Sequence, residues 1–398
     1  MRKTTFAVAL IVVLAALTGG GVAAAKGGPG HGKGKKGKKP GTPSVKIFAS
    51  GFNNPRGLTF GPGGKLYVAE GGLGGTHSSA SDACPQAHGA AAPYFGSTND
   101  PVRGGRISKI DKKGHVSTVV DALPSSQTSP ALGNLVSGVS SVAFVHNKLY
   151  ALLAGAGCSH GVPTVPNGVI RVKHGSWNLI ANLSAFQVAN PVAQPDDEDF
   201  EPDGTWYSMT SAGGALYPMD SNHGELDKVT TSGHISRVVD ISAQVGHGVP
   251  TAIVPLGKKG KHHGHKWSHH KSPQFAIANL GVFGPEDGTT PNESVWTINA
   301  MGHLTQKATG FEQVLGLAFR GHSLYALEMS TTPGGPTPGT GAIVQVGPSG
   351  PVKTVVSGLI FPTGMTVGKD GAFYVSEQGF GFDPPGSGSG RILRITTH

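Results

Sequence analysis

The sequence predicts an all-β fold, a six-bladed β-propeller closed by the N-terminal strand completing the last blade. One phrase recurs six times along the 398 residues, and its last copy is incomplete. The segment 352–359, VKTVVSGL, matches the first segment after the basic tail, 45–52, VKIFASGF. The last apolar segment of this final repeat is 390–395, which leaves the repeat one strand short. Pairing the N-terminal strand with this last repeat would close the ring and remove an exposed sheet edge.

Each repeat contains four short apolar segments separated by Gly, Pro, Asp or Asn, a pattern that predicts an antiparallel meander. We expect strands at 56–60, 65–70, 105–110 and 116–120 in repeat one; 142–144, 149–151, 168–172 and 177–180 in repeat two; 216–220 and 235–239 in repeat three; 294–298 in repeat four; 317–319, 324–328, 343–346 and 352–356 in repeat five; and 365–367, 373–377 and 391–395 in repeat six. Four-stranded copies of about 45 to 80 residues predict a propeller rather than a sandwich. A seven-bladed ring with one unrecognised blade is the rival interpretation, and helices should be nearly absent.

Residues 1–25 have the pattern of a signal peptide. Arg2 and Lys3 precede an apolar run at 6–17, and small residues follow up to a cleavage site near Ala25. The run is shorter than the ~20 residues that span a membrane. We therefore expect a secreted or extracytoplasmic protein with no transmembrane segment in the mature chain, with a retained N-terminal anchor as the alternative.

The net charge of +9 is concentrated in two Lys-rich segments. The tail at 26–44 carries six Lys, and the Lys/His-rich insert at 257–273 in repeat four carries five. Without these and the two basic residues near the start, 19 basic residues remain against 23 acidic ones. A body of this charge argues against nucleic-acid binding. The tail should be disordered, and both segments are suited either to an anionic cell-envelope polymer or to a solvated linker role.

The chain contains two cysteines, Cys84 and Cys158, which lie in equivalent loops of consecutive repeats. In an exported protein this placement predicts one structural disulfide. A reactive thiol pair is the less favoured interpretation.

The blade phrase resembles that of NHL-type and SMP-30-like six-bladed propellers, and most closely that of the ScyD/ScyE family of exported propellers. The resemblance rests on 249–252 (VPTA), on 311–319, on the loop and strand at 333–346, and on 361–365 (FPTGM). It covers roughly residues 44–398 and implies the fold without a settled reaction. The insert at 257–273 and the long loop at 71–104 depart from the family pattern.

The extra length of the chain falls on one face of the expected ring. Connections between second and third strands share this loop-rich face with the connections between blades, and they are long at 71–104, 155–167, 282–293, 330–340 and 378–389. Long Gly/Pro-rich loops often accompany recognition. An unknown ligand or protein on this face is one interpretation, and tolerated drift of surface loops is the other.

Acidic residues end the second strand in four repeats: Glu70, Asp220, Glu328 and Glu377. Their equivalent positions predict an axial ring of carboxylates. With Asn222 nearby, such a ring could hold Ca²⁺ or another divalent metal. The alternative, which we favour, is that these carboxylates cap backbone N–H groups or pair with Arg.

The remaining polar clusters favour non-catalytic roles. The insert histidines His262, His263, His265, His269 and His270 lack surrounding residues to orient them and would bind metal only adventitiously. The acidic run at 196–199 favours a solvated loop over a Ca²⁺ site. His247 is the one interblade histidine suited to the role that quinone-dependent sugar dehydrogenases require. No phosphate loop, nucleophile elbow or zinc-protease motif occurs in the sequence.

Together these features predict an exported, monomeric propeller that acts as a binding or scaffold module at the cell envelope or outside the cell. The alternative is a metal-dependent hydrolase or lactonase of SMP-30-like type that uses the axial carboxylates to activate water. The sequence assigns no catalytic residue.

Overall fold

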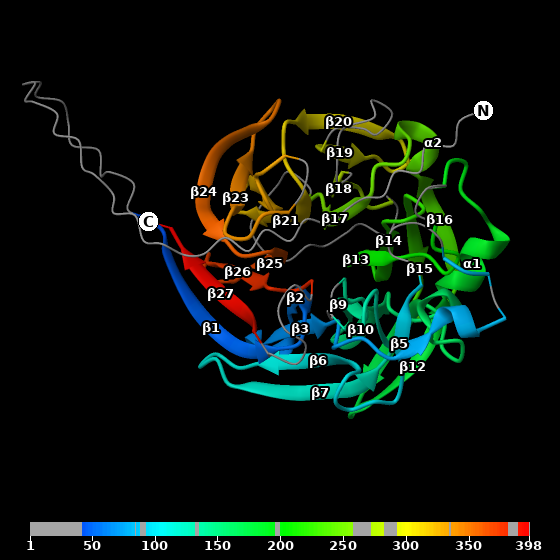
Figure 1. The fold of residues 1–398 in the computed structure, drawn as a ribbon. Helices are drawn as coiled ribbons and strands as arrows, with labels where there is room; N and C mark the ends of the chain where they lie inside the picture. The colour runs from blue at the N-terminus through cyan, green and yellow to red at the C-terminus, as the bar shows by residue number, and fades with distance from the viewer. Residues whose placement is uncertain are drawn as a thin grey trace, which may run out of the picture. The chain divides into compact units, whose positions relative to one another are not determined.

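The computed structural model describes residues 42–397 except 84, 88–92, 132–134, 196–199, 258–271, 282–292, 334–335 and 381–388. Six four-stranded antiparallel sheets follow one another in this part of the chain, and each forms one blade of a propeller (Figure 1). The blades are numbered here from the one that contains β2.

The strands of each blade follow in chain order except in blade six, which the N-terminal strand completes. Blade one contains β2 (Pro55–Phe60), β3 (Leu66–Glu70), β6 (Gly105–Ile110) and β7 (Val116–Leu123). Blade two contains β9 (Val139–Val145), β10 (Lys148–Leu153), β11 (Gly168–Lys173) and β12 (Ser176–Asn182). Blade three contains β13 (Trp206–Ala212), β14 (Ala215–Asp220), β15 (Glu225–Val229) and β16 (Ile235–Asp240).

Blade four contains β17 (Pro250–Pro255), β18 (Phe275–Asn279), β19 (Ser294–Ile298) and β20 (Leu304–Thr309). Blade five contains β21 (Val314–Arg320), β22 (Ser323–Glu328), β23 (Gly341–Val346) and β24 (Pro351–Leu359). Blade six contains β25 (Pro362–Val367), β26 (Phe373–Glu377), β27 (Gly390–Thr396) and β1 (Ser44–Phe52).

The ring closes in the way that the sequence predicts. The innermost strands β2, β9, β13, β17, β21 and β25 contact one another in this order, and β25 contacts β2 again. Strand β1 pairs with β27 in antiparallel register, from Ser44 opposite Thr396 to Phe52 opposite Gly390. The pairing joins the blue and red ends of the ribbon (Figure 1). The all-β fold is confirmed, and the six four-stranded sheets are consistent with the predicted six blades; the described residues form no seventh four-stranded sheet.

Apolar side chains between neighbouring blades form the core. Between blades two and three, for example, Leu152 and Val169 pack with Trp206 and Leu216, and all four are fully buried. Alternation along each strand directs such residues to both faces of a blade. Burial of each large apolar side chain contributes roughly 1.5–3 kcal/mol.

Side-chain hydroxyls also join neighbouring blades near the axis. Ser140 of β9 donates to the Trp206 carbonyl in blade three at 2.7 Å. Thr363 of β25 donates to the Pro55 carbonyl in blade one at 2.6 Å. These buried hydrogen bonds fix the relative positions of the inner strands, to which the candidate site is attached.

The structure adds elements that the repeat pattern does not predict. The region from 71 to 104, expected to be a loop, contributes β4 (His77–Ser78) and β5 (Phe95–Ser97). With β8 (Ser125–Gln127) they form a three-stranded sheet in which β5 is the central strand. The short helices are α1 (Leu183–Ala189), α2 (Ser242–Val245) and the 3₁₀ turns η1 (Pro62–Gly64), η2 (Ser79–Ser81) and η3 (Cys158–His160). Helices are otherwise scarce in the described residues, as predicted.

In blade four the segment 256–274 separates β17 from β18. This position agrees with the predicted insertion between the first two strands, although its five histidines lie outside the described residues. The signal-peptide segment and residues 26–41 of the tail also lie outside them, whereas Ser44, the last residue of the predicted tail, begins β1. Among the helices that the structure describes, none has the length and hydropathy needed to cross a bilayer.

Candidate functional site

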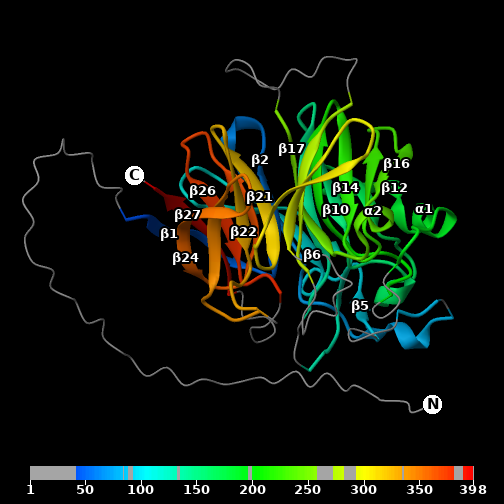
Figure 2. The same cartoon turned by 90° about the horizontal axis from the view of Figure 1, so that it is seen from above.

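The loop-rich face carries an ordered layer of its own. We call β4, β5, β8 and η3 the platform. Strand β5 lies beyond the ends of the blade strands on one side of the ring (Figure 2). Gly96 of β5 approaches η3 so closely that a Cβ atom there would lie 2.4 Å from the His160 carbonyl oxygen. The platform therefore joins the long connection of blade one to that of blade two.

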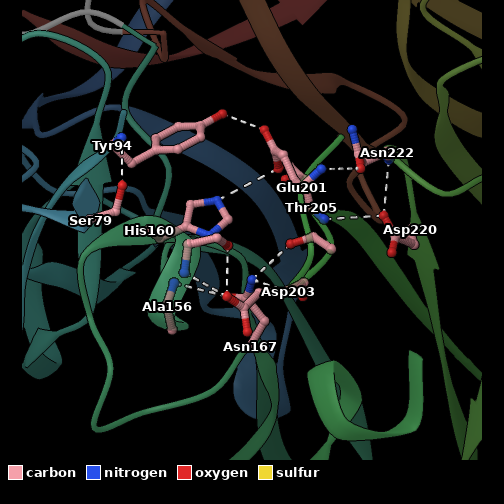
Figure 3. A network of polar contacts seen from close by, with 12 residues as sticks. Ser79, Tyr94, Ala156, His160, Asn167, Glu201, Asp203, Thr205, Asp220 and Asn222 are labelled. Atoms are coloured by element: carbon pink, nitrogen blue, oxygen red, sulfur yellow. Dashed lines mark hydrogen bonds and ion pairs between the residues drawn. The ribbon is translucent and has the colours of Figure 1, made fainter. Parts of the chain in front are cut away.

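A buried polar network lies at the junction of the platform and blade three (Figure 3). The Tyr94 hydroxyl donates to Glu201, and His160 Nε2 lies 3.6 Å from Glu201 Oε2. The Tyr94 and His160 rings contact each other with centroids 4.6 Å apart. Burial lowers the pKa of His160 to about 4, so the imidazole is neutral at physiological pH.

Asp203 and Asn167 extend this network into the backbone. Asp203 Oδ2 accepts from the Ser159 hydroxyl at 2.6 Å and from the Ser159 N–H at 2.7 Å. Asn167 accepts from the Ala156 N–H and donates to the Gly204 carbonyl, both at 2.8 Å. These side chains connect three chain segments and hold the loops of blades two and three in one arrangement.

The predicted carboxylates at the ends of the second strands make local contacts. Each accepts a hydrogen bond from a backbone N–H in the segment leading into its own blade: Glu70 from Asn53, Asp220 from Thr205, Glu328 from Glu312, and Glu377 from Ile360, at 2.7–3.1 Å. Glu70 also pairs with Arg106 at 2.7 Å, and Glu377 pairs with Arg391 at 2.8 Å. The contacts are those of capping and ion pairing, the interpretation that the sequence favoured.

Asp220 and Asn222 are brought together, but as parts of the polar network. Asp220 Oδ1 accepts from the Asn222 N–H at 2.9 Å, and Asp220 Oδ2 lies 2.9 Å from His223 Nδ1. Asn222 Oδ1 accepts from the Glu201 N–H at 2.9 Å.

The carboxylates of the predicted ring each accept from a backbone N–H, and within the described ranges no three His, Cys, Asp or Glu side chains form a group that could hold a metal ion. A metal at these residues stays a prediction.

Glu328 differs from the other three carboxylates. It is 4% exposed, and no Arg pairs with it among the described ion pairs. Burial raises its pKa to about 7, against the smaller opposing effect of the Glu312 N–H. A carboxyl with this pKa could exchange a proton near neutral pH.

Aromatic and basic residues meet where opposite blades face each other. The Tyr207 hydroxyl of blade three donates to the Thr363 carbonyl of blade six at 2.9 Å, a bond that crosses the axis of the ring. The Arg56 guanidinium of blade one lies 5.6 Å from the Tyr207 ring centroid and 4.1 Å from that of Phe380. We call Arg56, Tyr207 and Phe380 the axial cluster.

Sequence reasoning missed the axial cluster and the network around His160. The repeat alignment carried a signal for the first, because Arg56 in Pro-Arg-Gly takes the place of Thr363 in Pro-Thr-Gly. No such signal exists for the network, whose residues lie in loops of different repeats.

His247 lies half-buried between α2 and β17. Cys158 begins η3, but Cys84 lies outside the described residues, so their pairing stays a prediction.

Comparison with known proteins supports the fold and leaves the activity open. No family model matches the chain, and no curated protein matches its sequence. The ScyD/ScyE resemblance therefore stays a prediction. The structure is similar to a proposed oxidoreductase (glucose dehydrogenase) from Thermus thermophilus, with a TM-score of 0.53, 16% identity, and coverage of 89% of this chain and 100% of the other.

Two further similar structures are more distant. A PQQ-bound aldose sugar dehydrogenase from Streptomyces coelicolor has a TM-score of 0.49 and 12% identity, over 90% of this chain and 100% of the other. A gluconolactonase from Xanthomonas campestris has a TM-score of 0.42 and 9% identity, over 92% and 99%. The likeness to the Thermus protein, at 16% identity, shows the β-propeller fold alone.

Proposed function

We propose that this protein is an exported ligand-binding propeller whose binding surface is the loop-rich face. The observation that carries the proposal is the platform, an ordered layer that closing the ring does not require. The buried network of Tyr94, His160 and Glu201 joins this layer to blades two and three. A surface held in one conformation before the ligand arrives loses less entropy on binding.

The chemistry of the network supports binding over catalysis. His160 is fully buried and neutral, and the Ser159 hydroxyl donates to Asp203 Oδ2 at 2.6 Å, closer than its 3.3 Å contact with His160 Nδ1. The carboxylates that a hydrolase would need are engaged as caps and ion-pair partners. These groups are arranged to hold loops in position.

A turnover assay separates the binding module from an enzyme. We expect the full chain to hydrolyse neither gluconolactone nor p-nitrophenyl esters faster than buffer alone. It should also not speed the oxidation of glucose by a quinone acceptor, and added Ca²⁺ or Zn²⁺ should change neither result. Saturable turnover that Glu328→Gln abolishes would overturn the proposal.

Hydrogen exchange provides the matching positive test. A library of small acids, sugars and lactones is screened for compounds that raise the melting temperature. A genuine ligand should slow amide exchange in η3, β5 and β8 but not in the turns of the opposite face at 111–115 and 230–234. Protection confined to those turns would contradict the proposed face.

The alternative, a hydrolase or lactonase, is favoured by one observation. Glu328 is buried on the loop-rich face with a pKa raised to about 7, which suits a general acid or base. Under this alternative, the pH–rate profile should have an inflection near 7 that Glu328→Gln removes.

We extend the proposal to the Lys-rich segments at 26–44 and 257–273. Their charge would attract an anionic cell-envelope polymer, and this attraction weakens with salt. The full chain, which we propose to be a monomer, should co-sediment with alginate at low ionic strength. A variant lacking both segments should remain in the supernatant, and unchanged sedimentation of that variant would contradict the proposal.

A further inference from the structure

Arg56 is a buried cation without a carboxylate partner among the described residues. It is 6% exposed and lies on the innermost strand β2. Its Nη2 donates to the Val136 carbonyl, a neutral acceptor. Buried charges in proteins are normally paired, because removing a charge from water has a large free-energy cost.

Other arginines of this chain show the usual behaviour. Arg106, Arg237, Arg391 and Arg394 each form an ion pair with an acidic side chain, although their side chains are 23–35% exposed. The more deeply buried Arg56 therefore has the greater need of a counterion.

The shape of the axial cluster restricts what the counterion can be. The Phe380 and Tyr207 rings lie near the guanidinium, with centroids at 4.1 and 5.6 Å, and Tyr207 is held by its bond to the Thr363 carbonyl. A guanidinium has five N–H donors directed outward in its plane. A carboxylate matches that edge with two parallel hydrogen bonds.

We propose that the axial end of the loop-rich face binds a small organic carboxylate through Arg56. The inference rests on the proposed function, since it supplies the ligand class for the same face. The carboxylate lies in the plane of the guanidinium, next to the aromatic rings of the axial cluster, and neutralises the buried charge. Arg56 is the residue that determines the preference for an anion.

The test measures the melting temperature of the full chain, and the binding affinity by isothermal titration calorimetry, with malonate, acetate and inorganic phosphate. Sodium chloride at the same ionic strength is the reference. We expect malonate or acetate to raise the melting temperature saturably. Arg56→Lys keeps the charge but loses the paired donors, so the affinity should fall at least tenfold. Arg56→Met should abolish the response.

Arg320→Met is the matched control. Arg320 also lies near an aromatic ring, 5.3 Å from the Phe373 centroid, but in blade five and away from the axial cluster. This variant should respond to malonate as the unaltered chain does. An equal loss in Arg320→Met would show a general salt effect and overturn the proposal.

Four outcomes would overturn this inference, and the third of them would leave the proposed function standing. No saturable response of the unaltered chain to malonate or acetate overturns the carboxylate site, and so does a response to phosphate alone. A library compound that protects η3 and β8 equally in Arg56→Met also overturns it, but leaves the binding module standing. Arg56→Met should also melt no lower than the unaltered chain in anion-poor buffer, because the variant has no buried charge to neutralise. A large drop would instead assign Arg56 a purely structural role and overturn the proposal.

Discussion

At the scale of single residues, the same carboxylate position serves different purposes in different blades. Glu70 and Glu377 combine a backbone cap with an Arg partner, whereas Glu328 has the cap without an Arg among the described ion pairs. Sequence position predicted that these residues are equivalent. It could not predict their electrostatics, because the partners come from other strands and differ between repeats.

Glu70→Gln tests whether the cap and ion pair account for this residue. The change leaves Arg106 without its partner and weakens the acceptor for the Asn53 N–H. We expect the free energy of unfolding to fall by about 2–3 kcal/mol. The loss should be the same in Ca²⁺ and in EDTA, measured by urea unfolding. A loss seen only in Ca²⁺ would indicate a metal site.

The buried carboxyl of Asp227 predicts a pH dependence. Burial raises its pKa from 3.8 to about 7, and neither carboxylate oxygen has a hydrogen-bond partner among the described residues. The unfolded chain loses this proton above about pH 4, whereas the folded protein keeps it up to about pH 7. The free energy of unfolding therefore falls as the pH rises through that interval.

Asp227→Asn should reduce this dependence and leave the part contributed by Glu225, whose pKa burial raises to about 9. The variant should match the unaltered chain near pH 4 and exceed its stability by on the order of 2 kcal/mol at about pH 8. Urea unfolding at several pH values measures the difference. Asp370→Asn is the contrasting control: burial is the largest single effect on the pKa of Asp370 and raises it, but hydrogen bonds from Arg394 and neighbouring groups together lower the pKa. A destabilised Asp227→Asn at about pH 8 would contradict the argument.

At the scale of elements, the turns between third and fourth strands attach each blade to the previous one. Equivalent positions in three of these turns are occupied by Gly114, Gly233 and Gly302, and each has a positive φ. A Cβ atom at any of them would approach a carbonyl oxygen on the fourth strand of the preceding blade, to 2.0 Å from Ile180 in the case of Gly233. The repeated Gly therefore reflects both backbone conformation and close blade contact.

Gly233→Ala should separate the two effects when compared with Gly321→Ala. Both glycines have positive φ, but no described atom lies within 4 Å of the Cβ position at Gly321. The control should lose roughly 1–2 kcal/mol from backbone strain alone. Gly233→Ala should lose measurably more because the Ile180 carbonyl must move. Equal losses in thermal or urea unfolding would show that the contact adds nothing.

The sequence predicts most accurately those elements that occur in several copies along the chain. It predicts β6, β19 and β26 with their observed bounds, and the other strands for which it gives bounds within a few residues, because these segments recur between turn residues. The platform occurs once. The Tyr94–Glu201 bond joins residues 107 positions apart, and no local pattern connects them. The candidate site is built from these unrepeated segments, so it is the part of the structure that the periodic sequence pattern predicts least well.

At the scale of the whole molecule, stability depends on closure by one strand. Strand β1 covers the edge of β27 over its full length, and Phe52 of β1 is fully buried. Without β1 the ring would keep an open edge, which invites pairing with another chain. Closure also fixes the distance between opposite blades, on which the Tyr207–Thr363 bond depends.

Removing residues 26–52 should therefore abolish the cooperative melting transition or lower its midpoint by more than about ten degrees. The reason is that the edge of blade six becomes exposed and the buried side chains of β1 are lost. Removing only 26–41 is the control and should leave the transition unchanged. Light scattering should show association of the shortened chain, because β27 can pair with a second copy. Adding a synthetic peptide of 44–52 should restore the monomer and part of the transition. An unchanged midpoint after loss of β1 would mean that the other interblade contacts hold the ring, and the axial cluster would then not depend on closure.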